Sequence, residues 1–208
     1  MSGVMELARA ERADLAELLA GLAPQQWQAP TLCDGWQVRD VVAHVLSYEE
    51  LDAAGLARRL ARGRFLLGRA NAAGVTAYAG YDPQQLLDLL HRSMRPRGLT
   101  AAFGGRIALL DAMIHQQDIR RPLGITRDIP AERIRTALTF ARIAPPIGAP
   151  WRIRGLRLVA TDLDWAAGRG DEVRGPAEAL LMAMAGRRGV TDELTGPGRA
   201  TLARRTGG

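Results

Sequence analysis

Hydrophobic residues recur three and four positions apart through most of the chain, which is the spacing of an amphipathic helix. The first segment shows this spacing at Leu15, Leu18, Leu19 and Leu22. A second segment repeats it, and its apolar positions are Val38, Val41, Val42 and Val45. We therefore expect the chain to begin with two helices joined by a loop.

Further helices are predicted from the helix-start and helix-stop residues. Asp82-Pro83 is a typical helix start, because aspartate caps the first turn and proline fits the first helical position. Helices are also expected over 101–120 and from near Pro130. The stretch 53–79 is less clear, and we expect a helix there that is broken by glycines, namely Gly63, Gly68, Gly74 and Gly80.

The pattern changes after residue 148. Apolar residues alternate with arginines from Trp151 to Leu158, which favours short strands, and a helix is expected over 177–185. The sequence thus predicts a mainly α fold: an antiparallel helical bundle over residues 1–148, followed by a small α+β lobe over residues 149–208.

Composition narrows the class of protein. Hydrophobic residues make up 47% of the chain, enough for a full core. No apolar run approaches the ~20 residues of a membrane span, and no leader peptide is recognised, so we expect a cytoplasmic protein that binds no membrane. The charge is +6 and every one of the 28 basic residues is arginine. Because the arginines are scattered, we attribute them to codon bias and expect no nucleic-acid partner.

Three acidic or imidazole groups share one face of the predicted helix over 101–120. Asp111 and His115 are four residues apart and Asp118 follows three later, so the three project together. His44 lies beside the valine stripe of the second helix. Two imidazoles and one carboxylate form a ligand set that leaves a coordination position open, as in catalytic zinc sites. The spacing leaves a second interpretation open, in which the pair is only a local electrostatic contact.

The remaining histidine and the single cysteine are given plainer interpretations. His91 is expected on the surface. Cys33 excludes a disulfide within the chain and is interpreted as an inert, buried or half-buried thiol, because no basic residue clusters near it in sequence.

Two segments of the chain resemble the signatures of a known family. The run from Pro30 to Val45, Pro-Thr-Leu-Cys-Asp-Gly-Trp-Gln-Val-Arg-Asp-Val-Val-Ala-His-Val, and the run from Asp111 to Gly124 are similar to those of the mycothiol-dependent maleylpyruvate isomerase family. The segments 155–165 and 174–181 resemble the C-terminal lobe of the same group. The resemblance implies a DinB-like antiparallel four-helix bundle.

The resemblance also implies a metal and a cosubstrate. It assigns His44, Asp111 and His115 to a divalent metal, usually zinc. Asp40 lies one helical turn before His44 and Asp118 one turn after His115, so either is a candidate to accept the free ring N–H of a ligating histidine. Mycothiol would serve as the thiol that adds to an electrophilic substrate, in isomerisation or S-transfer. For the substrate carboxylate or the thiol we choose an arginine of the C-terminal lobe, Arg174, with Arg157 as the alternative.

One departure from the family keeps a second function open. The family's acid is commonly glutamate, and the shorter Asp111 is expected to weaken the metal site, so that Asp111→Glu would tighten it. The alternative to an enzyme is a non-catalytic metal-binding or regulatory module on the same bundle. A small-molecule thiol and an electrophile are the expected partners, for a monomer or a homodimer.

Overall fold

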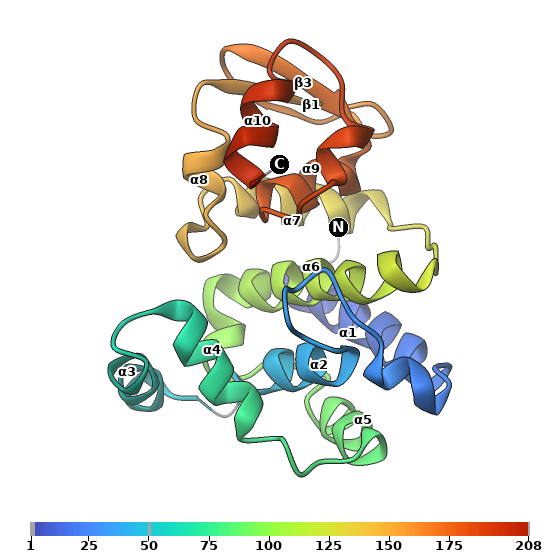
Figure 1. Ribbon diagram of the computed structural model, residues 1–208, viewed down its shortest axis with the longest axis vertical. Coiled ribbons are helices and arrows are strands. Elements are labelled where there is room, and N and C mark those ends of the chain that lie inside the picture. Colours follow the sequence, from blue (N-terminus) through green and yellow to red (C-terminus); the bar gives the residue numbers. More distant parts are fainter. Residues whose placement is uncertain (1–2, 50, 208) are drawn as a thin grey trace. The chain divides into compact units, whose positions relative to one another are not determined.

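The chain divides into two compact units in the computed structural model, which describes residues 3–49 and 51–207. The first unit is Met1–Thr126 and the second is Arg127–Gly208. Figure 1 draws the first in blue to green and the second in yellow to red. The predicted class is confirmed, since helices dominate and the strands form one small sheet. Over the described ranges, no helix combines the length and the apolar character that a bilayer span requires.

The regular elements that the structure describes in the first unit are helices. Its α-helices are α1 (Val4–Ala20), α2 (Val38–Leu46), α3 (Ala53–Arg62), α4 (Leu67–Thr76), α5 (Pro83–Arg92) and α6 (Arg106–Leu123). The long helices α1 and α6 pack against each other, and α2 contacts α4, α5 and α6 (Figure 1). The central position of α2 matters for the site, because it brings one face of α2 to α6.

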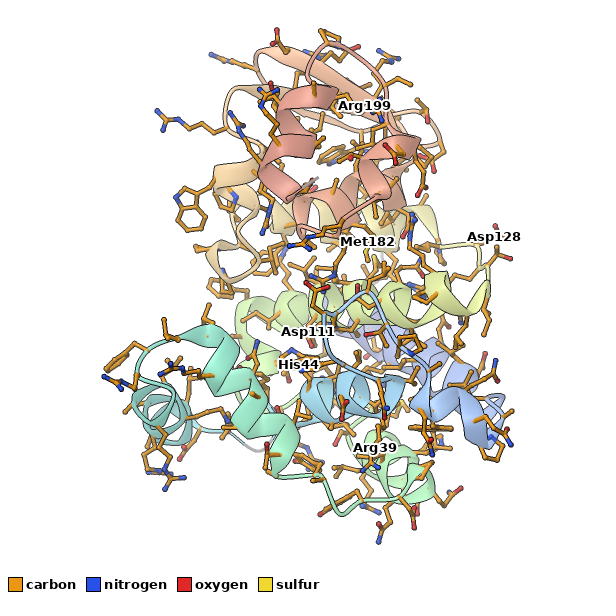
Figure 2. All side chains as sticks on the ribbon, viewed as in Figure 1. Arg39, His44, Asp111, Asp128, Met182 and Arg199 are labelled. Carbon is orange, nitrogen blue, oxygen red and sulfur yellow. The ribbon has the colours of Figure 1, made fainter. Side chains whose placement is uncertain are left out.

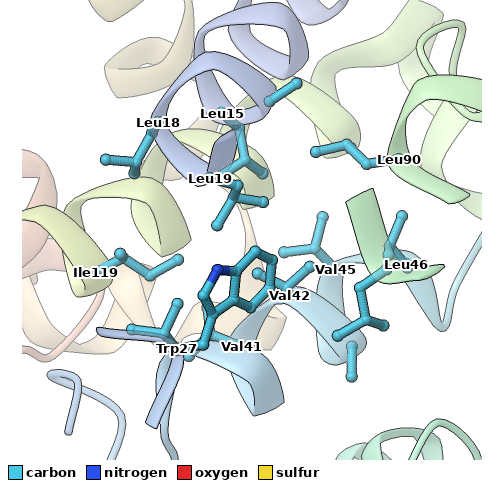
Figure 3. Close-up of a cluster of buried hydrophobic side chains, with 14 residues drawn as sticks. Leu15, Leu18, Leu19, Trp27, Val41, Val42, Val45, Leu46, Leu90 and Ile119 are labelled. Atoms are coloured by element: carbon cyan, nitrogen blue, oxygen red, sulfur yellow. The ribbon is translucent and has the colours of Figure 1, made fainter. Parts of the chain in front are cut away.

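The core of this unit joins the two apolar stripes that the sequence predicts. Leucines of α1 and valines of α2 meet there, and side chains from α5, α6 and the loop before α2 complete the cluster (Figure 3). The labelled members are Leu15, Leu18, Leu19, Trp27, Val41, Val42, Val45, Leu46, Leu90 and Ile119. Burial of these stripes holds α2 in a fixed rotation about its axis.

The prediction that glycines break the helix over 53–79 is only partly right. Gly63 ends α3, but Gly68 and Gly74 lie inside α4. A Cβ at Gly74 would lie 2.7 Å from Ser47 Oγ and 2.9 Å from the Nη1 atom of Arg59. Glycine is therefore used here for close packing of α4 against the end of α2, and the helix continues through it.

The second unit combines helices with a three-stranded sheet in the order β2-β1-β3. Its elements are α7 (Ala131–Ala141), α8 (Ala149–Arg152), β1 (Leu156–Ala160), β2 (Ala166–Gly168), β3 (Asp171–Gly175), α9 (Ala177–Met184) and α10 (Arg199–Thr206). Strand β1 pairs antiparallel with β2 and parallel with β3. The division between the two compact units falls after residue 126 of the chain, whereas the sequence pattern places it at residue 148; α7 belongs to the second unit because it packs against α9.

Candidate metal centre

Helix α6 carries three groups of the site on one face. Asp111, His115 and Asp118 follow one another at intervals of four and three residues, so they stack along the helix. The His115 side chain is 10% exposed, that of Asp118 is fully buried, and that of Asp111 is 29% exposed. The exposure therefore rises toward Asp111, which gives the site one side that solvent can reach.

Helix α2 places His44 opposite this face. Its Nε2 atom lies 3.9 Å from Asp111 Oδ1, and the Nε2 atom of His115 lies 3.5 Å from the same oxygen. The two imidazole rings meet edge to face, with centroids 4.7 Å apart. The labelled His44 and Asp111 lie close together in Figure 2. The structure thus brings together the three residues that the sequence singles out as ligands.

Neighbouring residues hold α2 and the His44 ring. Gln37 and Asp40 form a capping box at the start of α2, in which the Gln37 amide donates to Asp40 Oδ2 at 3.0 Å. Asp40 therefore caps the helix, and Asp118 is the acid that partners a histidine of the site. The ring of His44 contacts two aromatic rings, Trp36 at 5.1 Å and Tyr48 at 5.5 Å between centroids.

The donor atoms suit a divalent metal. Asp118 Oδ2 lies 2.9 Å from His115 Nδ1, so the proton belongs on Nδ1 and the Nε2 lone pair faces Asp111 and His44. Metal bonds of 2.0–2.1 Å in a tetrahedral site separate adjacent ligand atoms by about 3.3 Å. The separations of 3.5 and 3.9 Å between the Asp111 oxygen and the imidazole nitrogens are close to this value. The residues present therefore fit a divalent ion.

The pKa values of His115 and Asp111 are both raised, for different reasons. Burial lowers the pKa of His115, but the carboxylates of Asp111 and Asp118 outweigh this effect and raise the pKa to about 10. Burial raises the pKa of Asp111, although the charges of His115 and Arg12 act against it. A metal-free site therefore carries a proton on His115 at neutral pH, and a bound cation would take over that positive charge.

Cys33 has a role that its sequence neighbours do not indicate. Its Sγ atom donates a hydrogen bond of 3.1 Å to Asp118 Oδ2 and lies 3.8 Å from His115 Nδ1. The interpretation of Cys33 as half-buried holds, but its thiol contacts the candidate ligand His115 on the Nδ1 side of the ring. The residues that surround it are 82 and 85 positions away along the chain, which is why local sequence gave no signal.

Arg174 lies on β3 of the second unit. Its Nη1 atom is 2.7 Å from Glu172 Oε1, and Arg157 Nε approaches the other oxygen of the same carboxylate at 3.7 Å. Both arginines are about half exposed, at 48% and 54%. The two candidates thus share one acidic partner, and the choice of Arg174 for substrate binding stays a prediction.

Comparison with known proteins connects both the chain and its fold to one group. Residues 8–97 match the family described as the mycothiol maleylpyruvate isomerase N-terminal domain. The structure is similar to a crystal structure of a histidine-to-alanine mutant of the mycothiol-dependent maleylpyruvate isomerase, with a TM-score of 0.61, 17% identity, and 93% of this chain and 91% of that chain covered. The structure of that isomerase itself gives a TM-score of 0.55 at 16% identity, with the same coverage. No curated protein gives a significant match. At these identities the structural likeness establishes the fold.

Proposed function

We propose that the chain is a metal-dependent enzyme that acts with a low-molecular-weight thiol. The premise is the match of residues 8–97 to the mycothiol maleylpyruvate isomerase N-terminal domain family. The thiol is mycothiol, and the reaction is isomerisation of, or S-transfer to, an electrophilic substrate. The observation that carries the proposal is the convergence of His44, Asp111 and His115 on one point.

These three residues would hold a divalent ion, for which zinc is our choice. A bound ion of this kind lowers the pKa of a coordinated thiol, so that the thiolate nucleophile exists at neutral pH. Three protein ligands leave a position open for that thiol. A structural zinc site would use four protein ligands, so the composition of the set favours catalysis.

The surrounding residues orient the ligands and limit access. Asp118 keeps the proton of His115 on Nδ1, and contacts with Trp36 and Tyr48 restrict the ring of His44. The thiol of Cys33, the single cysteine of the chain, is engaged with Asp118. This arrangement supports a nucleophile supplied from outside the protein. Arg174 is proposed to bind the substrate carboxylate.

Metal content tests the first half of this proposal. Elemental analysis of protein purified without chelator should give about one divalent ion per chain, and His44→Ala and His115→Ala should lose it. His91→Ala is the matched control, because His91 is an exposed histidine on α5 and its removal should leave the metal content unchanged. Substoichiometric metal that is the same in all four proteins would contradict the site.

Thiol chemistry tests the second half. Mycothiol added to the cobalt-loaded protein should produce a thiolate absorption band, and maleylpyruvate should be consumed only when mycothiol is present. Arg174→Gln should raise the KM for maleylpyruvate while leaving the thiolate band intact. A metal-loaded protein with no thiolate band and no thiol-dependent turnover would favour the non-catalytic binding module.

A further inference from the structure

Two hydrogen bonds join the segment before α2 to one residue of α6, Asp118. The backbone N–H of Leu32 donates to the carbonyl oxygen of Asp118 at 3.1 Å. The neighbouring Cys33 donates through its thiol to the Asp118 side chain, at 3.1 Å from Oδ2. One residue of α6 therefore receives both a backbone and a side-chain hydrogen bond from this segment.

The backbone bond depends on a proline one turn later in α6. In an α-helix the carbonyl of residue 118 accepts from the N–H of residue 122. Residue 122 is proline, which has no N–H. Because residue 122 has no N–H to donate, the Asp118 carbonyl can accept from the N–H of Leu32 instead. The sequence thus determines which carbonyl of α6 accepts from the segment before α2.

The side-chain bond reaches the candidate metal centre through one intermediate. Asp118 Oδ2 accepts from the thiol of Cys33 and lies 2.9 Å from Nδ1 of His115. The carboxylate is fully buried, so protein groups, and not bulk water, determine its orientation. A carboxylate that orients a ligating histidine commonly changes metal affinity 10- to 100-fold when it is disturbed.

We propose that Cys33 is a positioning residue for the candidate metal centre: its thiol holds the Asp118 carboxylate in the orientation that directs Nε2 of His115 toward His44 and Asp111. The proposal rests on the proposed function for the presence of a metal. The Cys33 thiol neither binds the metal nor reacts in this role, because its S–H donates a hydrogen bond to Asp118 Oδ2. The segment continues directly into α2, so the same attachment holds the helix that carries His44.

A pair of substitutions at Cys33 tests this. Cys33→Ala removes the donor, whereas Cys33→Ser keeps a hydroxyl that can donate to Asp118. We expect Cys33→Ala to weaken Co²⁺ binding about tenfold and to alter the visible d–d spectrum of the bound ion. Cys33→Ser should restore both. Thr31→Ala is the control for the loop's own hydrogen bonds, because Thr31 Oγ1 donates to the Trp36 carbonyl at 2.9 Å and accepts from the backbone N–H of Cys33 at 3.2 Å, and the variant keeps the thiol.

A second measurement does not require metal. In the metal-free protein, the Nδ1-bound proton of His115 should exchange with water faster in Cys33→Ala than in the wild type or in Cys33→Ser, as followed by NMR of ¹⁵N-histidine protein. If the wild type binds no metal, the proposed function fails, and this exchange experiment still decides the role of Cys33.

Each of the following groups of results would overturn the proposal. The first is equal Co²⁺ affinity, spectrum and proton exchange in the wild type and Cys33→Ala. The second is a serine variant as defective as the alanine variant, or a Thr31→Ala variant that reproduces the spectral change. The third is a cobalt–thiolate band in the wild type without added thiol, lost in both Cys33 variants, which would make Cys33 a ligand.

Discussion

The two ring nitrogens of His115 face different partners, and this division determines how the site responds to pH. Nδ1 lies 2.9 Å from Asp118, while Nε2 lies 3.5 Å from Asp111. Burial alone would lower the pKa of the ring, but the two carboxylates raise it to about 10. A metal must therefore displace the Nε2 proton before it can bind, because only the neutral imidazole is a ligand.

The first prediction concerns this proton. Below a pKa of about 10 the metal-free ring is protonated, so metal affinity should rise with pH by about tenfold per unit between pH 7 and 9. Binding near neutral pH should release about one proton, measurable by calorimetry in buffers of different ionisation enthalpy. In Asp118→Asn the loss of one carboxylate lowers the pKa of His115, so the dependence should move to lower pH. An affinity that is constant between pH 7 and 9 would contradict the assignment.

The second prediction concerns the length of the acidic ligand, and here the distances change the expectation from sequence. Asp111 Oδ1 already lies 3.5 and 3.9 Å from the two Nε2 atoms, close to the ~3.3 Å of a tetrahedral set. The extra methylene of Asp111→Glu would move the carboxylate out of this position. We therefore expect about tenfold weaker zinc binding in competition titrations, with Asp111→Ala weaker still. Tighter binding in the glutamate form would restore the original expectation.

At the scale of elements, the sequence predicts what depends on local spacing. The leucine and valine stripes indicate α1 and α2, and Asp82-Pro83 marks the start of α5. Alternation from Trp151 to Leu158 indicates β1 only from Leu156 onward, because Trp151 lies in α8. The ligand set also follows from helical spacing together with family resemblance. Tertiary partners could not be predicted in this way, and Cys33 is the clearest case. Pro122 was the one available signal, because it leaves the Asp118 carbonyl without its usual helical donor.

A buried ion pair that local sequence did not indicate joins three elements of the first unit. Arg12 on α1 bonds both carboxylate oxygens of Glu49, which follows α2, and also the carbonyl of Ser93 at the end of α5. The side chains are only 1% and 6% exposed. The Glu49 carboxylate also accepts from the backbone of Arg97 at 3.3 Å. This pair therefore connects the helix that carries His44 to its neighbours.

The third prediction follows from this burial. Glu49→Gln leaves the Arg12 guanidinium buried beside a neutral group, and removing one partner of a buried pair costs about 3–5 kcal/mol of unfolding free energy. Urea denaturation followed by circular dichroism measures the change. Glu6→Gln is the matched control: it removes the exposed Arg9–Glu6 pair, whose side chains are 51% and 60% exposed, and should cost less than about 1 kcal/mol. Equal losses in the two variants would show that the buried pair adds nothing specific.

At the scale of the whole molecule, several of the arginines that give the chain its charge of +6 donate hydrogen bonds to backbone carbonyls of the chain itself. In the second unit, Arg152 donates to the Met184 carbonyl at 3.0 Å, and Arg205 donates to the carbonyls of residues 152 and 154 at 2.8 and 2.7 Å. In the first unit, Arg39 donates to the carbonyls of residues 79 and 81 at 2.8 and 3.1 Å. These guanidinium groups stabilise loops and helix ends, and a phosphate would have to compete with those carbonyls for them.

The last prediction is that nucleic acid binds only weakly despite the calculated pI of 10.7. Because arginines on both units are engaged with backbone carbonyls, we expect a Kd on the order of 10⁻⁴–10⁻⁶ M at ~150 mM salt, which is the non-specific range. Fluorescence anisotropy with labelled duplex and single-stranded DNA measures it, and the binding should weaken further as salt increases. Replacing two exposed arginines at the end of α3 and in the turn after it, in Arg62→Gln/Arg64→Gln, should change the Kd by less than about tenfold, since few phosphate contacts are involved. Sequence-selective binding in the nanomolar range would instead make these arginines part of a recognition surface.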